Sequence, residues 1–313
     1  MYGDIKLYAG SACPELAQRV ADYIGMRLNR WEIITFPNEN IFIRLNSSVR
    51  GQDVYLIQTH DNPVHDNIME MLIAIDCFKR DSAGRITVVI PYMAYSQSDK
   101  KDQPRVPITA RLLADMIEVA GADRWITIDL HAGQIQGFYN IPGDSLTALY
   151  IICDYIRAKK LDATVVTTDL GYAKGGRNYA EKLGLPLAFV EKRRLGNEVG
   201  REALTLIGSV AGKDVLIVDD LVDTAGSVVQ AVNVVRAHGA RDVYLAFTHA
   251  VLSPPALERL ASLDIKEIVT TDTLPIAPSH RLPNMTVLTV AELLGEVIVR
   301  SHEGRSVGEL FNE

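Results

Sequence analysis

Acidic and hydroxyl side chains are crowded into one short stretch in the second half of the chain. The stretch begins with four apolar, mostly β-branched residues at 215–218, which predict a strand buried on both faces. The next nine residues hold three carboxylates and two hydroxyls, which belong to Asp219, Asp220, Asp223, Thr224 and Ser227. A helical pattern of valines then begins at Val228.

The place of these side chains, between a strand end and a helix start, indicates what they bind. Ligands of open parallel sheets lie beyond the carboxyl ends of the strands, and free N–H groups at a helix start suit a phosphate. We therefore expect a phosphate on the turn formed by Asp223, Thr224, Ala225, Gly226 and Ser227. The pair Asp219 and Asp220 is better placed for ribose hydroxyls or Mg²⁺. The alternative is a strand and an ordinary helix capped by Asp223 or Thr224.

Two other strand ends carry single polar residues. Asp129 and His131 follow a predicted strand of the first half, and Asp169 follows one of the second half. A lone histidine in such a place is more often structural, and an aspartate is equally well explained as a helix cap.

A run of three cations, from Lys192 to Arg194, ends a further predicted strand. Such a run is usually a solvated face. Beside a phosphate site, the same cations are candidates to stabilise the charge of a transferring diphosphoryl group, because that chemistry needs positioning and positive charge more than covalent catalysis.

Strands and helices alternate throughout the chain, which predicts the α/β class with mostly parallel sheets flanked by helices. The expected strands are 5–9, 33–36, 54–58, 86–90, 125–128, 164–167, 187–190, 215–218, 243–247, 267–270 and 285–288. The expected helices are 14–28, 64–78, 108–120, 146–158, 173–183, 228–235, 255–263 and 290–301. Alternating Ile41, Ile43 and Leu45 predict a hairpin arm. Two similar domains are expected, 1–145 and 146–313, with the last helix as a candidate to pack back on the first.

Composition excludes several classes of protein. The 313 residues are 48% hydrophobic and 23% charged, as in ordinary globular proteins. A net charge of −7 argues against a nucleic-acid partner. The three cysteines are widely spaced and predict buried thiols rather than disulfides or a metal site. No apolar run reaches the ~20 residues of a membrane span, and no signal peptide is recognised, so we expect a cytoplasmic protein without a membrane partner.

The motifs resemble those of a known family. Residues 215–227 resemble the phosphoribosyl-diphosphate motif of type I phosphoribosyltransferases and of ribose-phosphate diphosphokinases. The run Asp129–Phe138 resembles a run of the diphosphokinases, and so do segments at 91–95, 107–110 and 120–123. The resemblance extends from the first strand to the closing Ser306–Phe311.

The resemblance implies two type I phosphoribosyltransferase-like halves and transfer of a diphosphoryl group from ATP to the 1-hydroxyl of ribose 5-phosphate. The products are 5-phosphoribosyl 1-diphosphate and AMP, the cofactor is Mg²⁺, and the enzyme is a homo-oligomer, from dimer to hexamer. Lys192 and Arg194 then stabilise the transition state. His131 helps to bind Mg²⁺ and the nucleotide phosphates, and Asp169 lies near the metal or the ribose phosphate.

The nucleotide side departs from the family pattern. The implied nucleotide-binding residues are Phe36, Asn38, Asn40, Gln97, Ser98, Asp99 and Lys100. Asparagines 38 and 40 stand where the family has acids, neutral Gln97 stands where it has an arginine, and Ala225 stands where it has a glycine. An asparagine both donates and accepts hydrogen bonds, so the pocket either favours another nucleoside triphosphate or takes adenine through the asparagine carbonyls.

These departures leave two alternatives to an active diphosphokinase. One is a non-catalytic regulatory relative that binds nucleotide or pentose phosphate. The other is a plain phosphoribosyltransferase, which is weaker because those enzymes usually have one such domain.

Overall fold

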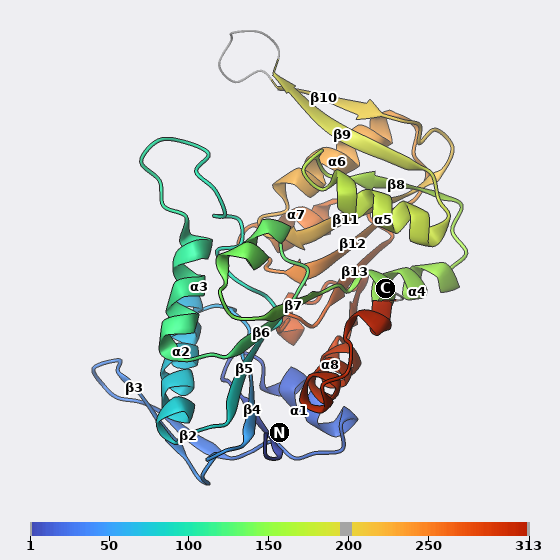
Figure 1. Cartoon of the computed structure of the whole chain (residues 1–313). Coiled ribbons are helices and arrows are strands. Elements are labelled where there is room, and N and C mark those ends of the chain that lie inside the picture. The colour runs from blue at the N-terminus through green and yellow to red at the C-terminus, as the bar shows by residue number, and fades with distance from the viewer. Residues whose placement is uncertain (1, 195–201, 312–313) are drawn as a thin grey trace. The chain divides into compact units, whose positions relative to one another are not determined.

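The computed structural model describes residues 2–194 and 202–311 and divides into two compact units (Figure 1). The first unit consists of Met1–Leu146, Thr273–Pro275 and Thr289–Glu313, and the second of Thr147–Asp272 and Ile276–Leu288. The last helix therefore belongs to the first unit. In the part of the chain that the structure describes, no helix combines the length and the apolar character needed to cross a membrane.

A five-stranded parallel sheet, in the order β1-β4-β5-β6-β7, forms the centre of the first unit. Its strands are β1 (Ile5–Ala9), β4 (Asp53–Ile57), β5 (Arg85–Ile90), β6 (Arg124–Ile128) and β7 (Gly143–Leu146). Its helices are α1 (Pro14–Tyr23), α2 (Val64–Arg80), α3 (Thr109–Ala120) and α8 (Ala291–Glu303), with short 3₁₀ turns at Gly133–Phe138 and Gly308–Phe311. An antiparallel hairpin, β2 (Trp31–Thr35) and β3 (Ile41–Leu45), forms a separate two-stranded sheet and confirms the predicted hairpin arm.

The apolar stripes of α2 and α3 form the core of this unit with the sheet. Met71 and Phe78 of α2 and Ile117 of α3 are fully buried in one cluster with Leu56 of β4 and Val88 of β5. The 3.6-residue spacing of the helical residues and the continuous apolar strands are what this arrangement requires.

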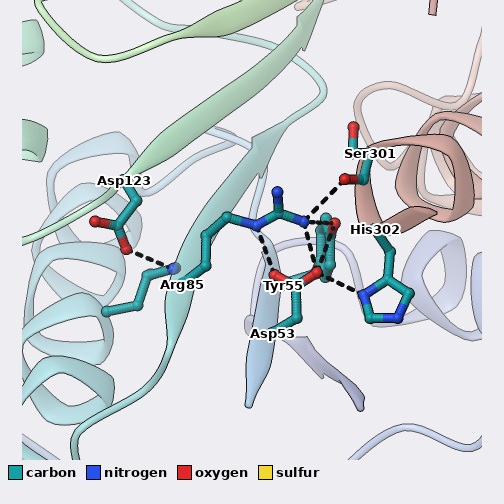
Figure 2. Close-up of polar contacts among 7 residues, drawn as sticks. Asp53, Tyr55, Arg85, Asp123, Ser301 and His302 are labelled. Carbon is teal, nitrogen blue, oxygen red and sulfur yellow. Dashed lines mark hydrogen bonds and ion pairs between the residues drawn. The ribbon is translucent and has the colours of Figure 1, made fainter. Parts of the chain in front are cut away.

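A buried ion pair fastens the last helix to the sheet of the first unit (Figure 2). Asp53 at the start of β4 is fully buried and accepts hydrogen bonds from Arg85 Nε at 2.7 Å and Nη2 at 2.6 Å. Nδ1 of His302 on α8 lies 2.8 Å from the Asp53 carboxylate, and Arg85 Nη2 also donates to the carbonyl of Ser301 at 3.1 Å. Removing one partner of such a pair costs about 3–5 kcal/mol, so this network holds the C-terminal helix on the unit.

The helices α1 and α8 approach closely within the first unit. A Cβ added at Gly295 of α8 would lie 2.5 Å from the ring of Tyr23 at the end of α1. Only glycine leaves room for this contact.

The second unit has a seven-stranded sheet in the order β10-β9-β8-β11-β12-β13-β14, in which only the β9–β10 pair is antiparallel. Its strands are β8 (Ala163–Thr167), β9 (Leu187–Arg194), β10 (Glu202–Ile207), β11 (Asp214–Val222), β12 (Val243–Ala250), β13 (Glu267–Thr271) and β14 (Met285–Leu288). Its helices are α4 (Leu149–Ala158), α5 (Ala173–Leu183), α6 (Gly226–Ala237) and α7 (Ala256–Ser262), with a 3₁₀ turn at Pro278–His280. The predicted α/β class with parallel sheets is confirmed.

Several predicted boundaries are wrong. The first helix ends at Tyr23 rather than residue 28, because Gly25 adopts a positive φ of 70° and terminates it. The strands β7 and β10 are not predicted, since both are edge strands in which polar and apolar residues are mixed. The strand predicted at 187–190 continues to Arg194, and the strand predicted at 215–218 continues to Val222.

Candidate active site

The carboxylates that were expected to follow strand β11 lie inside it. Asp219 pairs with Phe247 of β12, and β11 continues for three more residues to Val222. The strand is longer than the apolar run at 215–218 because its last residues also pair with β12. That strand is buried along its whole length. The acids therefore project from a paired backbone, which fixes their positions more firmly than a loop would.

The two acids contact each other and a neighbouring strand end. Asp220 is buried, and its N–H donates to Asp219 Oδ1 at 3.0 Å. Asp219 also accepts a hydrogen bond from the hydroxyl of Thr168, which directly follows β8. Burial, and then the nearby charge of Asp220, raise the pKa of the Asp219 carboxyl. The pair presents acceptor oxygens at the carboxyl edge of the sheet, where sugar hydroxyls can donate to them.

The turn after β11 is closed by Ala225, which has φ 60° and ψ 14° in the left-handed region. Ala225 is the N-cap of α6 and makes no side-chain capping bond, so the alternative of a cap by Asp223 or Thr224 is wrong. One carboxylate oxygen of Asp223 is buried and has no hydrogen-bond partner among the described residues. Because no side chain caps the helix, its first N–H groups remain available to a ligand.

Gly226, the first residue of α6, leaves a hollow in the turn, which is the space that a side-chain methyl group would occupy. A Cβ built on Gly226 would make only ordinary contacts, at 3.6 Å from Nη1 of Arg259 and 3.8 Å from Oγ1 of Thr224. A hydroxyl and a guanidinium therefore border this space, and both can donate to phosphate oxygens.

Two residues near this turn were not singled out in the sequence. Thr168 directly precedes Asp169, and the sequence alone does not indicate that its hydroxyl donates to Asp219. Arg259 stands in α7, far along the chain, and donates from Nη1 to the carbonyl of Thr224 at 2.8 Å. No sequence motif signals Arg259, because the contact exists only when α6 and α7 pack together.

Asp169 takes part in the turn that leads into α5. Its Oδ1 accepts from the N–H of Tyr172 at 3.2 Å, and its carbonyl accepts from the hydroxyl of Thr167 at 2.7 Å. The N-cap of α5 is Tyr172 and no side chain caps this helix, so the alternative of a helix cap by Asp169 is wrong, and its bond only shapes the turn before the helix. The carboxylate is half-buried and keeps its second oxygen for other partners.

The cationic run belongs to strand β9, whose pairing with β10 places Lys192 opposite Leu204 and Arg194 opposite Glu202. The side chains of Lys192 and Arg194 lie outside the part of the chain that the structure describes, so their roles stay predictions.

In the first unit, three expected nucleotide-binding residues lie at the tip of the β2–β3 hairpin. Phe36 is 45% exposed and packs against Phe42, with ring centroids 6.1 Å apart. The N–H of Phe36 donates to the carbonyl of Asn40 at 2.9 Å, and the N–H of Asn40 donates to the side chain of Asn38 at 3.3 Å. The tip is a tight turn that presents an aromatic ring and two amides to the surroundings.

The loop after β5 lines a cavity of about 520 Å³ in the first unit. Its lining residues are Tyr92, Tyr95, Ser96, Gln97, Ser98, Lys100, Asp102, Val106 and Pro107. The hydroxyl of Ser98 accepts from the N–H of Thr109 at 3.2 Å and so anchors the loop on the start of α3. Asp99 is buried and accepts a hydrogen bond from Gln134, which leaves Gln97 and Lys100 as exposed members of the loop.

His131 follows β6 in the first unit and is exposed. Over residues 2–194 and 202–311, no group of three or more histidine, cysteine or acidic side chains could hold a metal ion. Mg²⁺ usually needs only one or two protein ligands, because substrate phosphates and water complete its shell. His131 belongs to the first unit and Asp169 to the second, so each is described by itself and the metal-binding role of each stays a prediction.

The sequence matches two family descriptions and several characterised proteins. Residues 5–121 match the N-terminal domain of ribose phosphate pyrophosphokinase, and residues 197–312 match the phosphoribosyl synthetase-associated domain. The ribose-phosphate pyrophosphokinase of Caldanaerobacter subterraneus is 46% identical over 309 residues, which are 98% of this chain and 98% of that protein. The chain belongs to the ribose-phosphate pyrophosphokinase family.

A further relative and a solved structure match the chain over almost its whole length and carry names of the same family. Ribose-phosphate pyrophosphokinase 1, chloroplastic, of Arabidopsis thaliana is 44% identical over 98% of this chain and 77% of that protein. The crystal structure of phosphoribosylpyrophosphate synthetase from Mycobacterium smegmatis matches with a TM-score of 0.92 and 41% identity, over 96% of this chain and 99% of that one. These matches confirm the family resemblance, the fold class and the pyrophosphokinase activity predicted from the sequence.

Proposed function

We propose that this ribose-phosphate pyrophosphokinase transfers the diphosphoryl group of ATP, or of another nucleoside triphosphate, to the 1-hydroxyl of ribose 5-phosphate. The products are 5-phosphoribosyl 1-diphosphate and AMP. The observation that carries the proposal is the junction of β11 and α6, where two acids, an uncapped helix start and a hollow over Gly226 stand together in a chain of this family.

In the second unit, the sugar phosphate is bound by backbone and short side chains. The 5-phosphate rests on residues 223–227, where the N–H groups at the start of α6 and the hydroxyls of Thr224 and Ser227 donate to it. Asp219 and Asp220 accept hydrogen bonds from the ribose hydroxyls. The bond from Thr168 keeps the Asp219 carboxylate oriented toward the sugar.

In the first unit, the nucleotide is bound by the hairpin tip and the loop of residues 97–100. Phe36 offers a stacking surface for the base, and Asn38 and Asn40 offer amides for its edge. Gln97, Ser98, Asp99 and Lys100 form the polyphosphate side, where Lys100 supplies the positive charge. This division assigns residues 1–145 to the nucleotide and residues 146–313 to the sugar phosphate.

The transfer itself requires an in-line approach of the sugar 1-hydroxyl to the β-phosphorus. Lys192 and Arg194 neutralise the charge that spreads over the diphosphoryl oxygens in the transition state. The residues proposed as Mg²⁺ ligands are His131 in the first unit and Asp169 in the second. When bound, Mg²⁺ neutralises the phosphates and orients them for displacement.

A coupled assay tests the proposal with ribose 5-phosphate, Mg²⁺ and each of the four common ribonucleoside triphosphates. We expect 5-phosphoribosyl 1-diphosphate and a nucleoside monophosphate in equal amounts, because a diphosphoryl group leaves the nucleotide. If no triphosphate gave product, the proposed activity would be wrong. The expected homo-oligomer of two to six subunits and the cytoplasmic location stay predictions, which light scattering and fractionation check.

A further inference from the structure

Arg259 lies against the turn to which the proposed function assigns the 5-phosphate. Its Nη1 donates to the carbonyl of Thr224 at 2.8 Å and lies 3.6 Å from the position of a Cβ on Gly226. Both contacts are within the second unit. The guanidinium thus touches the backbone of the turn and also borders the hollow above it.

The negative charge around this turn exceeds the positive charge that the helix start supplies, so a cation there would stabilise a bound phosphate. Asp219, Asp220 and Asp223 bring up to three negative charges, whereas a helix start supplies only about half a positive charge. A sugar phosphate adds about two more negative charges near neutral pH. Arg259 offsets part of this repulsion at the place where the phosphate binds.

The guanidinium is also held in position. Arg259 lies in α7 between Ala256 and Leu260, which are buried in the same core cluster as Val228 of α6. An arginine has five N–H donors in a rigid fork. The bond to the Thr224 carbonyl fixes Nη1, and the rest of the fork can donate to phosphate oxygens over Gly226.

We propose that Arg259 is a substrate-binding residue that fixes the turn through the Thr224 carbonyl and pairs with the 5-phosphate of the sugar. This inference rests on the proposed function, and it adds a cation from another helix to a site built otherwise from one strand–turn–helix segment. The phosphate would lie over Gly226, where the missing side chain lets it approach the backbone of the turn.

Isothermal titration of ribose 5-phosphate into the full chain tests the inference without requiring turnover. Arg259→Gln should weaken binding about 10- to 100-fold, the worth of a hydrogen bond to a charged group. Arg259→Lys should restore part of the loss, because it keeps the charge but not the fork. Arg236→Gln is the matched control, since Arg236 of α6 pairs with Asp264 on the surface and its loss should leave the affinity unchanged.

Gly226→Ala tests whether the phosphate lies over Gly226, independently of the role of Arg259. The new methyl would make only ordinary contacts, at 3.6 Å and 3.8 Å, and alanine suits a helix better than glycine, so the thermal midpoint should not fall. The methyl would occupy the phosphate position, and ribose 5-phosphate binding should fall at least about 10-fold.

The dependence of binding on salt separates a phosphate contact from a purely structural role. Loss of a cation that pairs with the phosphate should flatten the plot of log Kd against log salt in Arg259→Gln, whereas the control Arg236→Gln should keep the slope of the unaltered chain. If Arg259→Gln binds ribose 5-phosphate as tightly as the unaltered chain, or binds it less tightly with an unchanged slope, the inference is overturned and the proposed function stands. If the unaltered chain binds no ribose 5-phosphate, both are wrong.

Discussion

The turn proposed for the sugar phosphate in the second unit and the segments proposed for the nucleotide in the first unit differ in what fixes their geometry. The turn lies between a paired strand and a 12-residue helix, and Val222, Ala225 and Val228 around it are buried in one core cluster. The nucleotide segments are a hairpin tip and a surface loop, in which Phe36 is 45% exposed and Gln97 is exposed.

This difference shows where the family pattern can change at little cost to the fold. Asn38, Asn40 and Gln97 depart from the pattern at exposed positions, where a new side chain disturbs no core packing. In the turn, the proposed phosphate donors are backbone N–H groups, which are present whatever the side chains are. The specificity for the base can therefore change while the site for the sugar phosphate stays the same.

Lys192→Ala should give the largest effect, because it removes a cation from the transferring group rather than from either substrate. We expect the turnover number to fall on the order of 10³-fold, as for loss of a cation in phosphoryl transfer. The Kd of ribose 5-phosphate should change less than about threefold. Lys213→Ala, which removes a surface partner of Asp162, is the control and should leave steady-state kinetics unchanged. A Lys192→Ala enzyme with normal turnover would contradict the assignment.

Gln97→Arg should change the binding of the nucleotide without changing the binding of the sugar phosphate. The variant introduces the arginine that the family resemblance implies, at a position that lines the cavity of the loop after β5. A charged hydrogen bond is worth about 1.5–3 kcal/mol, so the KM for ATP should fall about 10- to 100-fold while the KM for ribose 5-phosphate stays constant. Gln103→Arg, in the same loop but outside the cavity lining, controls for added charge. Equal effects of both variants would show that Gln97 does not face the nucleotide.

The same contrast explains which features could be predicted from the sequence. The sheet strands and the helix after the acidic turn are encoded by local patterns of apolar residues, and their types were predicted correctly. The pairing of β11 with β12 leaves no local signal in the sequence, so the predicted strand ends before Asp219 and Asp220, whereas the observed strand includes them. Arg259 was missed for the same reason, because its contact with Thr224 joins residues 35 positions apart.

The role of Ala225 could be predicted only in part. Its place in the turn was clear, but a glycine-like φ of 60° at an alanine contradicts the ordinary preference of that residue. The core packing of the junction overrides the preference. The Asp53–Arg85–His302 network was not predicted either, since it joins residues up to 249 positions apart.

A third prediction concerns His60, which is fully buried in the first unit. The N–H of Ala94 donates to its Nδ1 at 3.2 Å, so a proton on that nitrogen would displace the bond. Burial lowers the pKa of His60 from 6.5 to about 3. Between these values the unfolded chain binds a proton that the folded chain does not, so stability falls as the pH falls below about 6.5. The slope is about 1.4 kcal/mol per pH unit, or roughly 2 kcal/mol by pH 5.

Both tryptophans, Trp31 and Trp125, belong to the first unit, so their fluorescence during urea unfolding measures this effect where it arises. His60→Gln should remove most of the slope, whereas His65→Gln, at an exposed position, should keep it. The same pH dependence in His60→Gln and in the unaltered chain would show that another group is responsible.

The smallest effect is expected for Ala225→Gly, which tests how firmly the turn is set by its surroundings. Glycine relieves the strain of the positive φ, worth about 1–2 kcal/mol. The variant also loses a buried methyl, worth about 0.8 kcal/mol, and gains freedom in the unfolded chain, worth about 0.4–1 kcal/mol. These contributions nearly cancel, so the free energy of unfolding from circular dichroism should change by less than about 1 kcal/mol.

The Kd of ribose 5-phosphate should change less than about threefold, because strand pairing and the packing of α6 keep the N–H groups in place. A loss of binding as large as that expected for Gly226→Ala would mean that the methyl of Ala225, and not the junction, holds the turn in its binding conformation.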